Sequence, residues 1–343
     1  MDLYTPVRIR RVFDLSPKPS TFLRDTFFKN VENYSTKHVY FDVVDGARKV
    51  APFVNPKIGG EVVPNNGYQT KYYTAPLVAP DKVIEAEEML DRIPGEQIDS
   101  DMTPAERAVR KLSKDLVDMN EQIARREEVM CAEALFTGKI TIKGKGVDEE
   151  IDYGFTNKET VSKKWSATGS DPIADLRKWK QLISKHGHTS PNMCIMSTDV
   201  VSAFINNAVV KELLDIRNIN VAKIDPYEVK FGINYIGSIS ALGLSIYSYD
   251  EWYLDDWTNK DNPVEKPFVP EGTVGLFSTA APFSMLYGAI TKYDSKKVAH
   301  TFIGSRHPES FLSDDNNVLK VRVSSRPLAV PHNLKSWYIA KVL

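Results

Sequence analysis

The sequence predicts an α+β protein, and three stretches carry that prediction. Residues 103–137 have the pattern of one long amphipathic helix, residues 36–102 are rich in strand formers and prolines, and short strands mix with helices from residue 190 onward. Helices and strands that are segregated along a chain, rather than alternating regularly, are typical of the α+β class.

The long helix is marked at both ends. Thr103 and Glu106 have the spacing of a capping box, Pro104 suits the first helical position, and Gly138 suits the residue that ends a helix. At about 1.5 Å per residue, the predicted helix over residues 103–137 is roughly 50 Å long.

One narrow apolar stripe follows this helix, and its members are Ala105, Val109, Leu112, Leu116, Met119, Ile123, Met130 and Ala134. The stripe lacks sustained Leu and Ile and is broken at Arg126 and Glu127. A coiled coil needs an unbroken seam, so the pattern favours packing on a sheet, with a coiled-coil oligomer as the alternative.

The segment before the helix reads as a β-ribbon. A strand is predicted over residues 39–44, and Asn66-Gly67 forms a strong hairpin signal between the strand formers of 61–63 and 68–73. Prolines interrupt the segment at Pro52, Pro56, Pro64, Pro76 and Pro80. With limbs of about 20 residues the ribbon could extend roughly 60 Å, and since a two-stranded ribbon is not stable alone, it must lie on another surface.

The rest of the chain is predicted as short elements. Residues 1–35 form an arm with one short helix within 22–28, and helices are also expected from Pro172 to Gly187, at 199–206 and around 209–216. Strands are expected at 139–142, 150–153, 193–196, 230–233, 244–249, 273–278, 318–324 and 337–342, with a surface loop at 259–270.

Charge is segregated although the net charge is only −1. Residues 1–30 carry six Lys and Arg against three Asp, whereas residues 81–101 carry eight acids against Lys82 and Arg92. Two interpretations stand: solvated faces of one molecule, or complementary surfaces on separate copies of the chain.

No catalytic, metal or cofactor motif is recognised. His186 and His188 are the only close histidine pair and lack a third ligand, and the Asp255-Asp256 pair falls in a turn-rich loop. Cys131 and Cys194 make no disulfide framework, which indicates a reducing compartment. With no secretory leader or membrane span recognised, the chain is expected to stay in the cytoplasm where it is made.

Several short motifs occur in a recognisable order. They are Phe22-Leu23-Arg24-x-x-Phe27-Phe28, Lys37-x-Val39-Tyr40, Val54-x-Pro56-x-Ile58-x-Gly60-Glu61-Val62, Tyr73-Thr74-x-x-x-Val78-x-Pro80, Arg92-x-Pro94, Gly138-Lys139, Tyr287-Gly288-x-Ile290, Arg306-His307-Pro308 and Ala329. In this order they resemble the lambda-type major head protein family of tailed bacteriophages, also called phage major capsid protein E. The resemblance spans nearly the whole chain and is weakest over residues 190–280.

The resemblance implies the capsid fold named for phage Hong Kong ninety-seven. Its parts would be an N-terminal arm (1–35), an extended loop (36–102), a peripheral domain (103–189) with a spine helix (103–137), an axial domain (190–290) and terminal strands of the peripheral domain (291–343). Some proteins of this fold crosslink a ribbon lysine to an asparagine of a neighbour; Lys57 or Lys71 could serve, but nothing else in the sequence indicates this chemistry.

The resemblance further implies a non-catalytic major capsid protein that self-assembles into an icosahedral shell around double-stranded DNA. Its expected partners are further copies in hexamers and pentamers, separate scaffold, portal and decoration proteins, and packaged DNA bound non-specifically, with no membrane. Assembly in the host cytoplasm would place the protein in the virion. The alternatives are a cytoplasmic α+β enzyme with its site in residues 190–290, and an adaptor or nucleic-acid-binding module, which would need a basic surface that the composition does not indicate.

Contacts between copies are therefore the expected functional site, and no catalytic, cofactor-binding or metal-binding residue is predicted. The ribbon tip (Asn65, Asn66, Gly67) would rest on a neighbour. The acidic stem of the ribbon (Glu85, Glu87, Glu88, Asp91) would pair with Arg8, Arg10 and Arg11 of the arm or with Arg107, Arg110 and Arg125 of the long helix. The arm aromatics (Phe22, Phe27, Phe28) would be buried against another surface.

Overall fold

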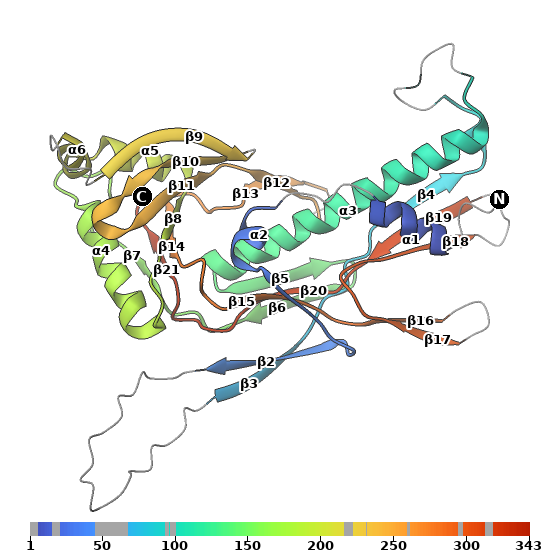
Figure 1. Cartoon of the computed structure of the whole chain (residues 1–343), viewed down its shortest axis with the longest axis horizontal. Helices are drawn as coiled ribbons and strands as arrows, with labels where there is room; N and C mark the ends of the chain where they lie inside the picture. The colour runs from blue at the N-terminus through green and yellow to red at the C-terminus, as the bar shows by residue number, and fades with distance from the viewer. Residues whose placement is uncertain are drawn as a thin grey trace, which may run out of the picture. The chain divides into compact units, whose positions relative to one another are not determined.

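The computed structural model describes residues 6–15, 21–44, 68–92, 96, 101–215, 222–230, 232–258, 261–293, 298–312 and 318–343. Helices and strands both contribute extensively, which confirms the predicted α+β class (Figure 1). The chain divides into two compact units, each assembled from separate stretches. Unit 1 comprises Met1–Val39, Tyr72–Val129 and Met285–Ala329, and unit 2 comprises Tyr40–Lys71, Met130–Ser284 and Val330–Leu343.

Unit 1 holds two short helices, most of the long helix and a set of strands. Its helices are α1 (Pro6–Leu15), α2 (Leu23–Phe27), the 3-10 turn η1 (Glu87–Met89) and α3 (Pro104–Phe136), the last of which continues into unit 2. Its strands are β1 (Asn30–Asn33), β4 (Asp81–Glu85), β16 (Ile290–Tyr293), β17 (Ala299–Phe302), β18 (His307–Leu312) and β19 (Val318–Ser324). The elements β2 (His38–Val44), β3 (Tyr68–Thr74), β15 (Phe283–Tyr287) and β20 (Pro327–Pro331) each run from one unit into the other.

The long helix α3 is confirmed, together with its capping box. The Thr103 backbone N–H donates to Glu106 Oε2 at 2.8 Å, and the Glu106 N–H donates to Thr103 Oγ1 at 3.3 Å. Each bond satisfies a backbone donor that the first helical turn would otherwise leave free.

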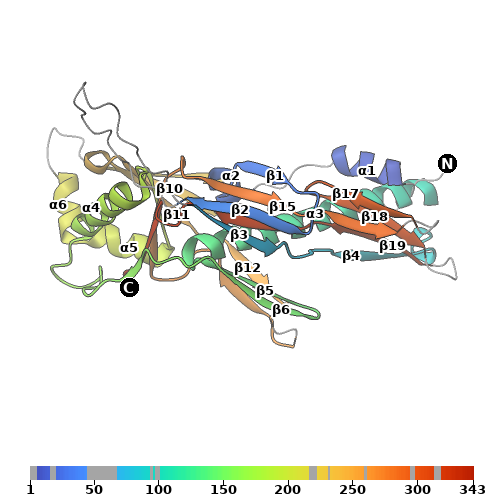
Figure 2. The same ribbon diagram turned by 90° about the horizontal axis from the view of Figure 1, so that it is seen from below.

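The apolar stripe of α3 packs on the sheet formed by β18, β19 and β4, as the sequence predicts. Leu112, Leu116, Met119 and Ile123 are fully buried in a cluster that also contains Ile9, Ile84, Val321 and Val323. Figure 2 shows β18, β19 and β4 side by side, and β19 pairs antiparallel with both neighbours. Ala105 and Val109, the first two members of the stripe, are exposed, so the buried part of the stripe begins at Leu112, about two turns later than predicted.

Unit 2 is organised around a seven-stranded sheet with the order β7-β21-β14-β8-β11-β10-β9. Its strands are β5 (Lys139–Gly144), β6 (Val147–Asp152), β7 (Lys158–Thr160), β8 (Met193–Met196), β9 (Ala222–Lys230), β10 (Ile233–Ile239), β11 (Leu244–Tyr249), β12 (Trp252–Asp255), β13 (Val264–Pro267), β14 (Thr273–Phe277) and β21 (Tyr338–Lys341). Its helical elements are α4 (Pro172–Leu182), the π-helical turn η2 (Ile183–Gly187), α5 (Thr198–Asn206), α6 (Ala208–Asp215) and the 3-10 turn η3 (Ser240–Leu242).

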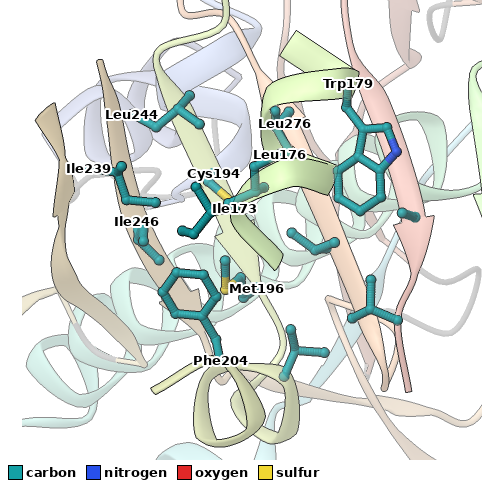
Figure 3. Close-up of a cluster of buried hydrophobic side chains, with 14 of the residues drawn as sticks. Ile173, Leu176, Trp179, Cys194, Met196, Phe204, Ile239, Leu244, Ile246 and Leu276 are labelled. Atoms are coloured by element: carbon teal, nitrogen blue, oxygen red, sulfur yellow. The ribbon is translucent and has the colours of Figure 1, made fainter. Parts of the chain in front are cut away.

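The core of unit 2 lies where α4 and α5 cover this sheet. Figure 3 shows Ile173 and Leu176 of α4 beside Cys194 of β8, within one buried cluster that also holds Met196 and Trp179. The Trp179 ring stacks on Tyr338 of β21. The start of α4 follows its sequence signals, since the Asp171 carboxylate accepts the Ala174 N–H at 2.9 Å and Pro172 is the first helical residue.

Two sequence predictions in unit 2 are wrong. Gly232, predicted to lie inside a strand over residues 230–233, is a turn residue with φ +72°, because β9 ends at Lys230 and β10 begins at Ile233. The predicted loop at 259–270 contains β13, which pairs with β12 in a two-stranded hairpin. β13 is mostly exposed, so it shows no apolar alternation that could identify it as a strand.

The ribbon is only partly described. β2 and β3 pair with each other, which agrees with the strand predicted at residues 39–44 and with the second limb of the hairpin. The predicted tip Asn65-Asn66-Gly67, the first limb at 61–63 and Lys57 lie outside the described residues.

Gly187 is predicted to be intolerant of any side chain. A Cβ added there would lie 2.1 Å from the backbone oxygen of Lys335, whereas one added at Gly144 would meet nothing within 4 Å. We expect Gly187→Ala to lower the free energy of unfolding by about 1–3 kcal/mol because the Lys335 backbone must shift. Gly144→Ala, the matched control, should change it by less than about 0.5 kcal/mol. Equilibrium urea denaturation measures both, and equal values for the two variants would contradict the crowding at Gly187.

Candidate intersubunit surface and buried charge cluster

The basic residues of the arm lie on α1. Arg10 and Arg11 are exposed there, and the side chain of Arg8 lies outside the described residues. These positions leave both arginines accessible, so their pairing with another copy stays a prediction.

The arm aromatics are buried within the chain itself. Phe22, Phe27 and Phe28 are 7%, 3% and 1% exposed. Little of their surface therefore remains for a neighbouring copy. Their burial instead stabilises the packing of α2 in unit 1.

The acidic stem is partly neutralised inside its own chain. The Glu88 carboxylate pairs with Lys111 of α3 and accepts the Glu85 N–H at 3.1 Å, and these two hydrogen bonds hold its pKa below the ordinary value. Glu85, Glu87 and Asp91 are exposed, and none of them forms a salt bridge with another described residue.

Two arginines near this stem are also bound internally. Arg107 was a predicted partner for the acidic stem of a neighbouring copy. It forms a bidentate contact with the buried Glu96 of its own chain at 2.8–3.1 Å. Arg322 of β19 holds Asp81 of β4 in the same side-on manner, and its guanidinium lowers the pKa of that carboxyl. Intrachain pairing thus accounts for part of the charge segregation seen in the sequence.

The most strongly buried charges of unit 1 surround Glu127, a fully buried residue of α3. Arg306 donates to both of its carboxylate oxygens, at 2.6 and 2.9 Å. Tyr287 Oη donates to it at 2.9 Å, and Arg24 Nε lies 3.4 Å away. Burial alone would lower the pKa of Arg306, but the Glu127 charge outweighs it and raises that pKa.

The next residue of the helix, Glu128, anchors the arm. Its carboxylate accepts the backbone N–H groups of Phe22, Leu23 and Arg24 at 2.9, 2.6 and 3.0 Å. It thereby caps the start of α2 from a residue more than one hundred positions away, a role that a Ser, Thr, Asp or Asn of the same segment more often plays.

From the sequence, Glu127 was recognised only as a break in the apolar stripe. A signal was nevertheless available, because Phe22-Leu23-Arg24, Tyr287 and Arg306 all belong to the motifs that carry the family resemblance, and all of them meet at Glu127 or Glu128. A cavity of about 440 Å³ adjoins this cluster, lined in part by Arg10, Arg24, Asn120 and Arg306.

Nothing in these surroundings indicates catalytic chemistry. In the part of the chain that the structure describes, no three His, Cys, Asp or Glu side chains gather in a way that could hold a metal ion. Among the same residues, no helix combines the length and apolar character that crossing a bilayer requires. Cys194 is fully buried, and burial raises the pKa of its thiol.

Solved structures identify the class of this fold. A protein described as a prophage capsid protein of Escherichia coli CFT073 superposes with a TM-score of 0.68 at 19% identity, over 98% of this chain and 96% of that one. A phage-related protein from Bordetella bronchiseptica RB50 gives a TM-score of 0.51 at 14% identity, over 98% and 96%. The fold is that of a phage capsid protein.

The family follows from the sequence comparison. The phage major capsid protein E model matches residues 5–342, and the chain belongs to that family. Its relatives include the major capsid protein of Escherichia phage lambda, 24% identical over 323 residues and 91% of each chain. The major capsid protein of Enterobacteria phage phi80 is 23% identical over 339 residues and 96% of each chain. Membership supports a structural role in a phage head and not the enzyme considered as the alternative.

The buried pair is predicted to be far more costly to break than an exposed one. Arg306→Met leaves the Glu127 carboxylate buried with only Tyr287 and Arg24 near it, and we expect a loss of about 3–5 kcal/mol in the free energy of unfolding. Lys139→Met is the matched control, because its pair with Glu150 is 41% and 52% exposed and should matter much less. Urea denaturation of both variants tests this, and a loss for Arg306→Met no larger than for the control would refute it.

Proposed function

We propose that this protein is the major capsid protein of a tailed bacteriophage and that its copies self-assemble into an icosahedral shell enclosing double-stranded DNA. The observation that carries the proposal is the match of the phage major capsid protein E family over residues 5–342. The prophage capsid fold, covering 98% of the chain, supports it independently of short motifs.

The proposal divides the chain by function. Residues 1–35 act as an arm, 36–102 as an extended loop, 103–189 as a peripheral domain with its spine helix, 190–290 as an axial domain, and 291–343 as terminal strands of the peripheral domain. The arm is proposed to contact other copies through Arg8, Arg10 and Arg11, and the extended loop through its tip and through Glu85, Glu87 and Asp91.

The proposed partners follow from a shell. Copies associate as hexamers and pentamers, assembly takes place in the host cytoplasm with a separate scaffold, and a portal and a decoration protein complete the head. DNA is contacted non-specifically, and the protein carries no catalytic residue.

Microscopy of the expressed full chain tests the proposal. Negative-stain images and sedimentation should reveal closed particles, tubes or capsomer rings, with or without a co-expressed scaffold. A protein that stays monomeric under all these conditions, and whose melting temperature rises with a small-molecule ligand, would favour the enzyme alternative.

The ribbon tip gives a sharper prediction. Gly67→Val places a β-branched residue where the hairpin turn predicted from the sequence needs positive φ, which disfavours that turn and the register of both limbs. We expect normal circular dichroism but no closed particles, because a two-stranded ribbon takes its stability from the surface on which it lies. Gly67→Asn is the control, since asparagine tolerates positive φ, and it should still assemble. Normal particles from Gly67→Val would show that the tip is not an intersubunit contact, and outright unfolding would place the ribbon in the core.

A further inference from the structure

One partly buried guanidinium of unit 1 lacks a carboxylate partner among the described residues, unlike Arg107, Arg306 and Arg322. Arg326 stands between β19 and β20, and its Nε is buried without a hydrogen-bond partner in the described chain. Burial lowers the pKa of this guanidinium, and no carboxylate contributes a compensating effect. An unpaired buried N–H destabilises the isolated subunit, by the same physics that favours pairing of every other buried donor.

The surroundings of Arg326 explain how it is held. Its Nη1 donates to the backbone oxygen of Ala75 at 3.3 Å, and its own carbonyl accepts the Gly288 N–H at 2.9 Å. Ala75 follows β3 directly and its N–H donates to the Lys37 carbonyl, so the guanidinium lies at the base of the ribbon strands. Nη1 is thus used to position the side chain, which leaves the edge formed by Nε and Nη2.

Two other arginines of unit 1 bind a carboxylate with that edge, whereas Arg306 holds Glu127 through Nη1 and Nη2. Arg107 uses Nε and Nη2 to hold Glu96, and Arg322 uses the same two nitrogens to hold Asp81. Side-on pairing of this kind is geometrically specific and stronger than a neutral hydrogen bond. The same edge of Arg326 has no acidic residue at it among the described residues, and its Nε is buried without a partner.

We propose that Arg326 is an intersubunit contact residue whose Nε–Nη2 edge receives a carboxylate from a second copy of this chain, at the base of the ribbon. The inference rests on the proposed function, since it requires that copies assemble. Carboxylates free for the purpose exist, because Glu85 and Glu87 are exposed and form no salt bridge in the described chain. Since Nε is covered in the single chain, docking includes a turn of the guanidinium that brings this edge outward and exchanges the 3.3 Å bond from Nη1 to Ala75 for the carboxylate.

The test separates a residue reserved for a partner from one that supports its own subunit. Arg326→Met keeps the apolar stem, removes the unpaired buried N–H and gives up one long bond, from Nη1 to the Ala75 backbone oxygen at 3.3 Å. We expect the full-length, unassembled subunit to unfold in urea at an unchanged or higher midpoint. Loss of a charge-assisted contact should raise the protein concentration needed for assembly, followed by light scattering, at least about tenfold. Arg326→Lys, which keeps the charge but not the fork, should lie between Met and wild type.

Arg177→Met is the matched control, because Arg177 is an exposed arginine of α4 and should tolerate the same substitution in both measurements. If Arg326→Met lowers the urea midpoint, or assembles at the wild-type concentration, the inference is wrong. If empty shells form normally and only DNA packaging fails, the partner is a phosphate and the carboxylate assignment is overturned. Absence of particles from wild type and Arg177→Met alike would refute the proposed function itself.

Discussion

The burial of two consecutive carboxylates on the long helix is the constraint on which unit 1 depends. Glu127 and Glu128 are 0% and 3% exposed, and a buried carboxylate is tolerated only when its charge and lone pairs are matched. Residues 22–24 satisfy one of them, and Arg306 with Tyr287 satisfies the other. Arm, helix and terminal strands must therefore come together in one arrangement, because any other arrangement leaves a charge unpaired. The apolar cluster around Leu116 also packs the helix on the sheet, but apolar contacts are less directional.

Much of the fold could be predicted because its signals are local. Thr103 with Glu106, and Asp171 with Pro172, satisfy backbone donors within their own turn, so their residue types alone mark the helix starts. Gly138 ends α3 with φ +76°, and a Cβ there would meet Phe155 at 2.3 Å, so glycine is required both by conformation and by space. The stripe of α3 likewise identified the face that packs on a sheet, except at Ala105 and Val109, which are exposed.

The rest could not be predicted because it is determined by distant partners. Glu127 and Arg306 are 179 positions apart, and no local pattern distinguishes a buried acid from a solvated one within an amphipathic helix. The strands β13, β17 and β18 have largely exposed or mixed faces, so the alternation that identifies a strand is missing. The acidic stem illustrates the same limit in the opposite direction. Its composition indicates a charged surface, but only the folded structure shows that Glu88 pairs with Lys111, and the nearby Glu96 with Arg107, within the chain.

The order of strands in the seven-stranded sheet has a consequence for the protein's synthesis. β21, at Tyr338–Lys341, lies between β7 and β14, parallel to the first and antiparallel to the second. β19 similarly completes the sheet that β4 begins more than two hundred residues earlier. While residues 318–341 are still inside the ribosome, the emerging chain exposes strand edges that have no partner, and such edges promote association with the wrong chain. Neither unit can be finished during translation, so a chain truncated before residue 338 lacks an interior strand and not a dispensable tail.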